Sequence, residues 1–371
     1  MNMKQKTTII VYVILLITFF SCEKQEKKVS FDVQEMPSIP LEGELMKEEL
    51  LTPRTVQMKF IQSKLFLFTP QEEDACLVTN EHADTIGHFA GIGQGPGELN
   101  QWPYFSGIST NQDTIYMFDD KIKKLYSYHL NVSSEKVQYK FLESKKIKEA
   151  KSPEGVIDNG IYYFVRLENG YHVGLRVINQ KDIFSLFDKD LNEIKRFGEY
   201  PFYDGLDKET NFRVTTCFNG ALRVQGNSLY YATQDFAYMA RYDIGNDGTI
   251  TKVWDNFYAK VHSVPKDNKF FFYADNIEGF ADMAIGKKYI YASYSGVESG
   301  EAKRQRSAMA LYPKHLLVLD FRGKPLAKFD LGKRYIPLCL DDEEEYIYIK
   351  HYDPDVSLWR YKVSDILKHI Q

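Results

Sequence analysis

The chain has 371 residues, of which 15% are aromatic and 26% charged, and its formal net charge at neutral pH is −4. A mildly acidic chain lacks the basic face that neutralises a row of phosphates, so the composition argues against nucleic acid as a partner. The tyrosines and phenylalanines lie with β-branched residues in short runs bounded by Gly, Asn and Asp, a pattern that favours strands. The sequence therefore predicts an all-β protein.

The N-terminus has the pattern of an export signal, because lysines precede the apolar stretch Ile9–Phe20 and Ser21-Cys22 closes it. This stretch is shorter than the roughly 20 apolar residues that a bilayer-spanning helix needs. A small residue directly before a cysteine, after bulky apolar residues, resembles the lipobox of bacterial lipoproteins. The resemblance implies cleavage before Cys22 and lipid attachment to its thiol. Two phenylalanines depart from the usual pattern and keep a plain secretory signal or an uncleaved anchor as alternatives.

After Cys22, the segment Glu23–Lys28 is charged or amide-bearing throughout and cannot bury itself, so we expect a flexible tether. Removal of residues 1–21 as a signal peptide leaves 350 residues, with 45 basic and 51 acidic side chains and a charge of −6. Residues 22–28 are then the tether and residues 29–371 the folded domain. The expected location is the bacterial cell envelope, lipid-anchored at the outer membrane, and facing either the periplasm or the surface.

Three further cysteines, Cys76, Cys217 and Cys339, are odd in number and far apart, so no disulfide framework follows. We expect small buried hydrophobic residues inside strands, with one disulfide pair plus a free thiol as the alternative. No two cysteines have metal-ligand spacing and the eight histidines are scattered. Neither a metal nor another cofactor is therefore expected.

One short phrase, an aliphatic residue followed by an aromatic one inside an apolar run, recurs six times. It occurs at Leu65-Phe66, Ile115-Tyr116, Ile161-Tyr162, Leu229-Tyr230, Ile290-Tyr291 and Ile347-Tyr348. Successive phrases are 50, 46, 68, 61 and 57 residues apart, which is about the length of a four-stranded propeller blade with a variable loop. We therefore predict a six-bladed β-propeller in which each phrase lies in the second strand of a blade, after an inner strand and a tight turn.

The last unit, Ile336–Val363, has room for three strands only. Since an unpaired strand edge exposes backbone donors and acceptors, we expect an N-terminal strand to supply the fourth and close the ring. Two segments qualify, Val29–Val33 and Glu44–Leu51. After the last strand, Val363–Ile370 has the periodicity of a turn or two of helix.

A glycine-rich segment lies between the first two units. Its residues Gly93, Gly95, Pro96, Gly97 and Glu98 match the Gly-x-Gly-Pro-Gly-Glu loop of the TolB-like six-bladed propeller lipoproteins of Bacteroidota, which the chain resembles along nearly its whole length. The resemblance implies the propeller fold and an envelope location, but no reaction. The glycines permit positive φ and the proline stiffens the loop, so we expect a structural turn in which Glu98 bonds exposed amides. A phosphate cradle is the alternative, although the glycine spacing differs from Gly-x-Gly-x-x-Gly and no Lys-Ser/Thr follows.

The connections between successive units are expected to gather on one face around the channel, the usual place for ligands or catalytic groups in a propeller. They carry arginines, carboxylates and aromatic rings, which suit a sugar ring or an anionic group. This candidate ligand-binding face comprises Arg54, Trp102, Tyr104, Glu154, Arg213, Glu278, Arg334 and Tyr335. The alternative for each residue is a structural role between blades. The acidic run Asp341–Glu345 is assigned to the opposite face, as a solvated turn rather than a calcium site.

The sequence has no Gly-x-Ser-x-Gly elbow and no local nucleophile–base pair, so we assign no catalytic residue and no metal ligand. It favours a non-enzymatic propeller, held at the membrane by lipid, that binds a glycan, peptide or envelope protein at its channel face. A hydrolase or lyase acting on a sugar or lactone is the alternative, because a propeller can assemble a site from several blades.

Overall fold

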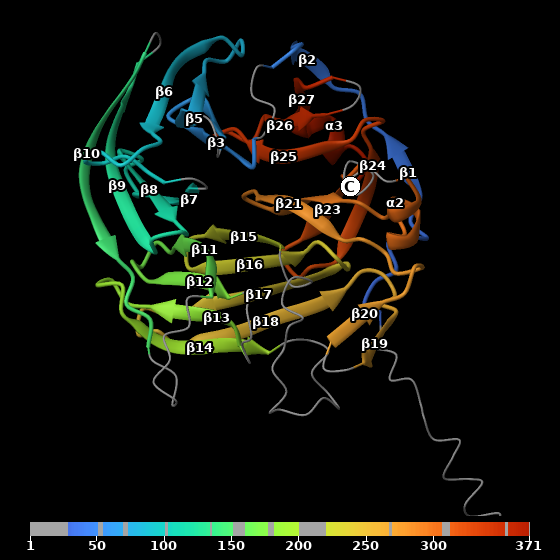
Figure 1. Cartoon of the computed structure of the whole chain (residues 1–371). Coiled ribbons are helices and arrows are strands. Elements are labelled where there is room, and N and C mark those ends of the chain that lie inside the picture. Colours follow the sequence, from blue (N-terminus) through green and yellow to red (C-terminus); the bar gives the residue numbers. More distant parts are fainter. Residues whose placement is uncertain are drawn as a thin grey trace, which may run out of the picture.

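The structure, a computed structural model, describes residues 29–50, 55–69, 73–100, 103–133, 136–150, 160–176, 182–199, 220–266, 269–305, 312–352 and 355–370. This part of the chain is β apart from two short helices, α2 (Ser299–Gln305) and α3 (Val363–Leu367). Six blade sheets are arranged in a ring, which confirms the predicted six-bladed propeller (Figure 1). Among the described residues no helix has the length and apolar character needed to cross a bilayer.

In each blade the strands pair antiparallel in chain order, with the first strand nearest the centre of the ring. Blade one is β3 (Gln57–Ile61), β4 (Lys64–Phe68), β5 (Asp74–Thr79) and β6 (Thr85–Gly91), and blade two is β7 (Pro103–Ile108), β8 (Thr114–Asp119), β9 (Lys124–Val132) and β10 (Val137–Lys146). Blade three is β11 (Ile161–Arg166), β12 (His172–Arg176), β13 (Asp182–Phe187) and β14 (Glu193–Glu199), and blade four is β15 (Gly220–Gln225), β16 (Ser228–Thr233), β17 (Tyr238–Ile244) and β18 (Ile250–Phe257).

The last two blades include strands from the N-terminus. Blade five is β21 (Phe280–Ile285), β22 (Tyr289–Tyr294), β23 (His315–Asp320) and β24 (Pro325–Asp330), with β1 (Ser38–Pro40) added in parallel beside β24. Blade six is β25 (Tyr335–Leu340), β26 (Tyr346–His351) and β27 (Ser357–Lys362), completed by β2 (Glu44–Lys47). A separate pair, β19 (Ser263–Lys266) and β20 (Lys269–Phe272), precedes blade five in the chain.

One of the six repeated phrases lies in a different strand from the one predicted. Ile161-Tyr162 opens β11, the first strand of blade three, whereas the other five phrases lie in second strands. The second strand of blade three is β12, which contains no Phe, Tyr or Trp and therefore lacks the phrase. If Val173 of β12 replaces Ile161 as the marker of blade three, the intervals of 46 and 68 residues become 58 and 56. The blade repeat is therefore more regular than the phrases indicate.

The ring closes through β2, which pairs antiparallel with β27 from Glu44 opposite Arg360 onward. Of the two segments expected to close the ring, Glu44–Leu51 thus contains the closing strand and Val29–Val33 does not. The backbone amide of Val33 instead donates to the carbonyl oxygen of Tyr258, just beyond β18, at 3.0 Å. The N-terminal segment therefore contacts three blades before it enters blade one, and Figure 1 shows β1 and β2 beside β24 and β27.

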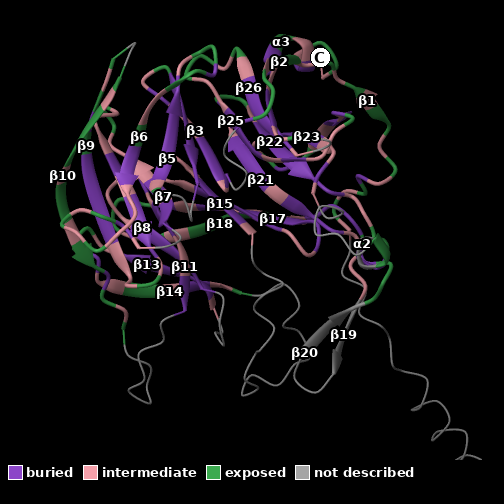
Figure 2. Cartoon of the chain, turned by 45° about the horizontal axis from the view of Figure 1, so that its top comes forward, coloured by how far each residue is buried: buried purple, intermediate pink, exposed green. Residues whose placement is uncertain are grey.

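Burial is concentrated in the inner strands of each blade, while β10, β14 and β18 carry exposed residues (Figure 2). Apolar clusters fill the spaces between blades, and one of them places Val33 against Tyr258, Phe280 and Tyr294. Val33 is fully buried, and its carbonyl oxygen accepts a hydrogen bond of 2.8 Å from Lys328 Nζ. The N-terminal segment is therefore part of the core.

The free cysteines among the described residues agree with the expectation of small buried hydrophobic side chains. Cys76 and Cys339 are free and buried. Burial raises the pKa of the Cys76 thiol well above its usual range, so the reactive thiolate is scarce at neutral pH. Cys217 lies outside the described residues.

We predict that Val33→Asp destabilises the whole domain by about 3 kcal/mol or more, because it places an unpaired carboxylate in an apolar cluster. The matched control is Glu44→Ala on the same segment, which removes only an exposed ion pair with Arg360 and costs about 0.2–1 kcal/mol. Urea unfolding of the mature protein measures both. Equal stabilities of the two variants would show that residues 29–40 are dispensable for the fold.

Candidate functional site

The two faces of the ring differ in the chain segments that they present. The connection face carries the links between successive blades, and the turn face carries the first turn of each blade, between its first and second strands. Half of the predicted ligand-binding residues lie outside the described residues, namely Arg54, Trp102, Glu154 and Arg213.

The other four predicted residues contact neighbouring protein groups. The Tyr104 hydroxyl donates to Tyr162 Oη at 2.9 Å, and Glu278 accepts a hydrogen bond from Ser299 Oγ at 2.5 Å. Arg334 Nη1 donates to the Tyr312 carbonyl oxygen at 3.2 Å. Tyr335 has no exposed surface, and its hydroxyl donates to the His315 carbonyl oxygen at 2.8 Å. The structure thus shows these four side chains in packing and hydrogen-bonding roles and does not gather them around one cavity.

The Gly-x-Gly-Pro-Gly-Glu loop forms a tight turn after β6. Glu98 Oε2 accepts a hydrogen bond from the Gly95 amide at 2.7 Å, and the Tyr128 hydroxyl donates to the Gly97 carbonyl oxygen at 2.9 Å. The Glu98 carboxylate thus bonds the amide within its own loop. Gly97 has φ of +78°, and a Cβ there would lie 2.6 Å from Phe141 Cγ. Glycine is therefore required at this position for both its backbone conformation and its lack of a side chain.

We predict that Gly97→Ala destabilises the protein by about 2–4 kcal/mol, since it adds a clash with Phe141 to the cost of a left-handed backbone. Gly332→Ala is the matched control, because Gly332 has φ of +70° with no atom within 4 Å of the added methyl. That variant is expected to lose only about 1–2 kcal/mol. Denaturant unfolding compares the two. An equal loss in both would mean that Phe141 moves aside freely.

On the turn face, hydrogen bonds join neighbouring first turns at five of the six blade junctions of the described chain. The Gln62 Nε2 donates to the Gln112 carbonyl oxygen (2.6 Å), Asn169 N to Asn227 Oδ1 (2.8 Å), Gln225 Nε2 to the Gly286 carbonyl oxygen (2.8 Å), Lys287 N to Glu344 Oε1, and Ser63 N to Asp342 Oδ2 (3.2 Å). Within the described ranges no such bond joins the first turns of blades two and three.

The acidic run Asp341–Glu345 is the first turn of blade six, and Asp341 accepts hydrogen bonds from the amides of Glu345 and Tyr346.

A cavity of about 390 Å³ occupies the centre of the ring at the turn face. It is lined by the first strands of blades one to four, β3, β7, β11 and β15, and by parts of their first turns. Its charged lining residues are Lys59, Arg166, Glu168 and Arg223. Arg223 is paired with the buried Asp282 of blade five. Among the described residues, three cations and one carboxylate therefore line this central cavity, called the channel below.

Lys59 is a half-buried cation of this lining, with Arg223 and Asp282 near it. Its Nζ lies 5.6 Å from the centroid of the Phe105 ring and makes no hydrogen bond or ion pair with the described residues. Burial and the nearby Arg223 together lower the pKa of Lys59 to about 8, against the opposing effect of Asp282. The ammonium form therefore predominates at neutral pH, where it can attract an anion into the channel.

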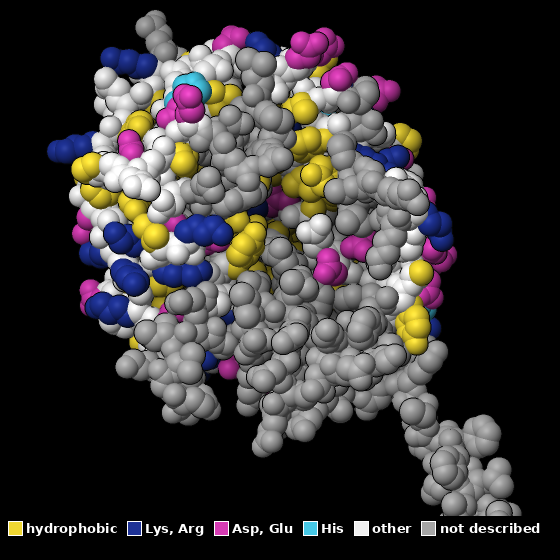
Figure 3. Space-filling view, viewed as in Figure 1, with side chains coloured by type: hydrophobic (Ala, Val, Ile, Leu, Met, Phe, Trp, Pro, Cys, Tyr) yellow, Lys and Arg dark blue, Asp and Glu magenta, His cyan; other side chains and the backbone are white. Residues whose placement is uncertain are grey.

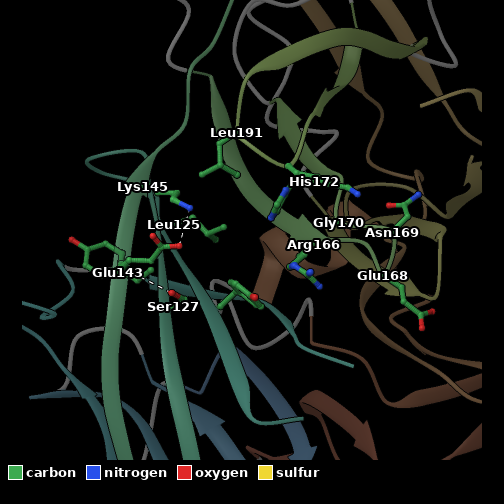
Figure 4. A pocket seen from close by; sticks show the side chains of 13 residues that line it. Leu125, Ser127, Glu143, Lys145, Arg166, Glu168, Asn169, Gly170, His172 and Leu191 are labelled. Atoms are coloured by element: carbon green, nitrogen blue, oxygen red, sulfur yellow. Dashed lines mark hydrogen bonds and ion pairs between the residues drawn. The ribbon is translucent and has the colours of Figure 1, made fainter. Parts of the chain in front are cut away.

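A second cavity, of about 350 Å³, opens between blades two and three. It shares Arg166 and Glu168 with the channel, so the two cavities adjoin. Figure 4 shows Arg166 and His172 of blade three facing the strands of blade two that carry Ser127, Glu143 and Lys145. This interblade pocket lies at the junction whose first turns have no hydrogen bond between them.

Sequence reasoning missed Lys59, Arg166 and His172, because it concentrated on the connection face. A signal was present for one of them: Lys59 interrupts the otherwise apolar run Met58–Ile61 in a first strand. Among the described residues no group of three or more His, Cys, Asp or Glu side chains converges to hold a metal ion.

Comparison with known proteins gives the fold only. No family model matches the chain, and no curated protein matches it. A crystal structure of a Bacteroides fragilis protein, provisionally described as exported, superposes with a TM-score of 0.55 at 11% identity, over 90% of this chain and 96% of that one. The β-propeller domain of Swd1 from Myceliophteria thermophila and the WD40 repeats of RRP9 have TM-scores of 0.44 and 0.46 at 8% identity, over 86% and 88% of this chain and 99% of each of theirs. The first of these likenesses shows the propeller architecture.

Proposed function

We propose that the protein is a lipid-anchored binding propeller of the bacterial cell envelope, which takes an anionic ligand at the turn-face mouth of its channel and acts by binding rather than catalysis. The observation that carries this proposal is the Lys59 ammonium group in the channel, which has no acidic partner among the described residues. Lys59 is half-buried in the lining of the cavity, so an anion that enters the channel can pair with its ammonium group.

The charge around the channel supports an anionic ligand. Within the described residues no carboxylate forms an ion pair with Lys59 or Arg166, and Phe60 and Phe105 line the same cavity. Residues 103–148, which contain blade two, hold eight lysines against five acidic residues in a chain of net charge −4. Figure 3 shows Lys and Arg side chains gathered over β7–β10. A basic region beside a cavity raises the local concentration of anions.

The envelope location rests on the lipobox resemblance around Cys22 and on the Gly-x-Gly-Pro-Gly-Glu loop of the TolB-like lipoproteins. The first described residues fit a tether that attaches at the rim, because the Phe31 amide donates to the Phe257 carbonyl oxygen at 3.1 Å, at the end of β18. That end of β18 belongs to the connection face, so an anchor there leaves the turn face open to ligands. A hydrolase or lyase is not proposed, because no observation in the described residues favours it.

We predict that Lys59→Met raises the melting temperature by about 2 °C or more while it abolishes binding of anions in the channel. The stabilisation should be full below pH 8 and decline between pH 8 and the pKa of about 10.4 of lysine in the unfolded chain, since the buried ammonium group costs stability only while it is protonated. Thermal unfolding with a panel of carboxylated and sulfated oligosaccharides and acidic peptides measures both effects. Lys64→Met is the matched control, because Lys64 lies on β4 beside Glu81.

The same panel gives a pH test. Wild-type affinity should fall as the pH rises through 8, where Lys59 loses its proton, and Lys59→Arg should bind with an affinity that stays level over that range. Ligands that bind Lys59→Met as tightly as the wild type would contradict the proposed function.

The anchor is tested separately. We expect the wild-type protein to incorporate labelled fatty acid and to fractionate with membranes, and Cys22→Ala to do neither, because acylation of a cysteine adds about 0.8 kcal/mol of membrane affinity per buried methylene. Metabolic labelling and cell fractionation measure this. An unlabelled wild-type protein would rule out the lipoprotein assignment but would leave the proposal of an anion site in the channel unaffected.

A further inference from the structure

The interblade pocket contains a buried side chain with unsatisfied polar atoms. His172 opens β12, is 4% exposed and stacks on Phe164 with ring centroids 5.3 Å apart. Neither of its ring nitrogens makes a hydrogen bond of normal geometry. Burial and the nearby Arg166 together lower the pKa of His172 to about 3, against the opposing effect of Asp188. The ring is therefore neutral at physiological pH and offers one N–H donor and one nitrogen acceptor.

Beside it, Arg166 supplies a cation that forms no ion pair with an acidic side chain in the described part of the chain. Its guanidinium lies 4.8 Å from the centroid of the Tyr116 ring, and it makes no hydrogen bond or ion pair with the described residues. A Cβ at Gly107 would lie 3.0 Å from Arg166 Cβ, so β7 passes close to the base of this side chain and restricts it. The guanidinium lies over the Tyr116 ring, and its fork of donors suits a planar carboxylate.

The rim of the pocket is polar and nearly balanced in charge. Lys145 Nζ and Glu143 Oε1, two residues apart on β10, form an ion pair of 2.9 Å, and Lys189 contributes a second ammonium group. Tyr116 and Tyr126 add aromatic surface on the blade-two side. A ligand in this pocket therefore meets charge at Arg166, hydrogen-bonding groups at the rim and aromatic rings along one wall.

These features select one class of ligand. The guanidinium fork requires an anion, whereas the acceptor nitrogen of a neutral imidazole repels a bare anion and pairs with a hydroxyl. A carboxylate and hydroxyl groups occur together on the ring of a sugar acid, and the C–H faces of such a ring pack on aromatic side chains. Inorganic sulfate supplies only the charge. A volume of about 350 Å³ lies within the range of small-ligand sites.

We propose that the interblade pocket binds a uronic acid residue of an acidic glycan, with its carboxylate on Arg166 and a ring hydroxyl on His172. This inference rests on the proposed function and names its ligand class. Because Arg166 and Glu168 line both cavities, the next acidic residue of the same glycan enters the channel toward Lys59. Binding therefore strengthens with chain length from one uronate residue to two or three.

Calorimetric titration of the mature protein with uronate oligomers of one to three residues tests the inference. The probes are galacturonate, glucuronate and mannuronate oligomers, with neutral galactose oligomers of equal length and inorganic sulfate as controls. The wild type binds at least one uronate series, more tightly with each added residue, and does not bind the neutral series. Arg166→Gln weakens that binding tenfold or more, and His172→Phe weakens it about tenfold, the effect of one lost hydrogen bond.

His172→Phe keeps the stacking on Phe164 and removes two unpaired nitrogens, so its melting temperature stays at or above that of the wild type, which separates lost binding from lost folding. Lys140→Ala on β10 is the surface control and leaves affinity unchanged. Uronate affinities that are equal in the wild type, Arg166→Gln and His172→Phe overturn the uronate site. The uronate site is also overturned if the protein binds sulfate or an acidic peptide but no uronate. If that binding depends on Lys59, the proposed function still holds. If it does not depend on Lys59, the uronate site and the proposed function are both wrong.

Discussion

A propeller holds its shape only when its ring is closed, and here closure depends on the pairing of β2 with β27. The N-terminal segment first packs Val33 into the core beside Tyr258 and then adds a strand to blade five, so residues distant in the sequence are fixed together before blade one begins. Closure in turn fixes the first strands around the channel. Lys59 of blade one is thereby held among charged groups from blades four and five, far from it in the chain.

The hydrogen bonds between first turns extend the same constraint to the turn face. Five junctions of the described chain are joined in this way, and the pocket lies at the remaining one, between blades two and three. Within the described residues, Lys59 in the channel makes no ion pair and the ring nitrogens of His172 in the pocket make no hydrogen bond. Buried polar atoms without a partner also occur elsewhere, for example at Thr79 and Ser295. Lys59 and His172 differ from these in that both line adjoining cavities, where a ligand can pair with them.

The fold could be predicted from the sequence because each blade repeats locally: an aliphatic–aromatic phrase marks five of the six second strands, and the short last unit requires closure from the N-terminus. The exception, β12, carries Gly174 after Val173, where its counterparts carry the aromatic residue of the phrase, which is why the phrase is absent from the second strand of blade three. The site could not be predicted in the same way. Its residues come from strands of different blades, and their neighbours are set by the ring rather than by sequence spacing. Only Lys59, a charge inside an apolar first strand, gave a local signal.

The central claim is that the ligand binds at the turn face of the ring. Hydrogen–deuterium exchange with and without the tightest-binding acidic oligosaccharide tests this claim most directly. The account predicts slower exchange in the first turns of blades two and three, residues 109–113 and 167–171, with no change in the connection-face loops 234–237 and 295–298. Protection confined to the connection-face loops would place the ligand on the opposite side of the ring and contradict the account.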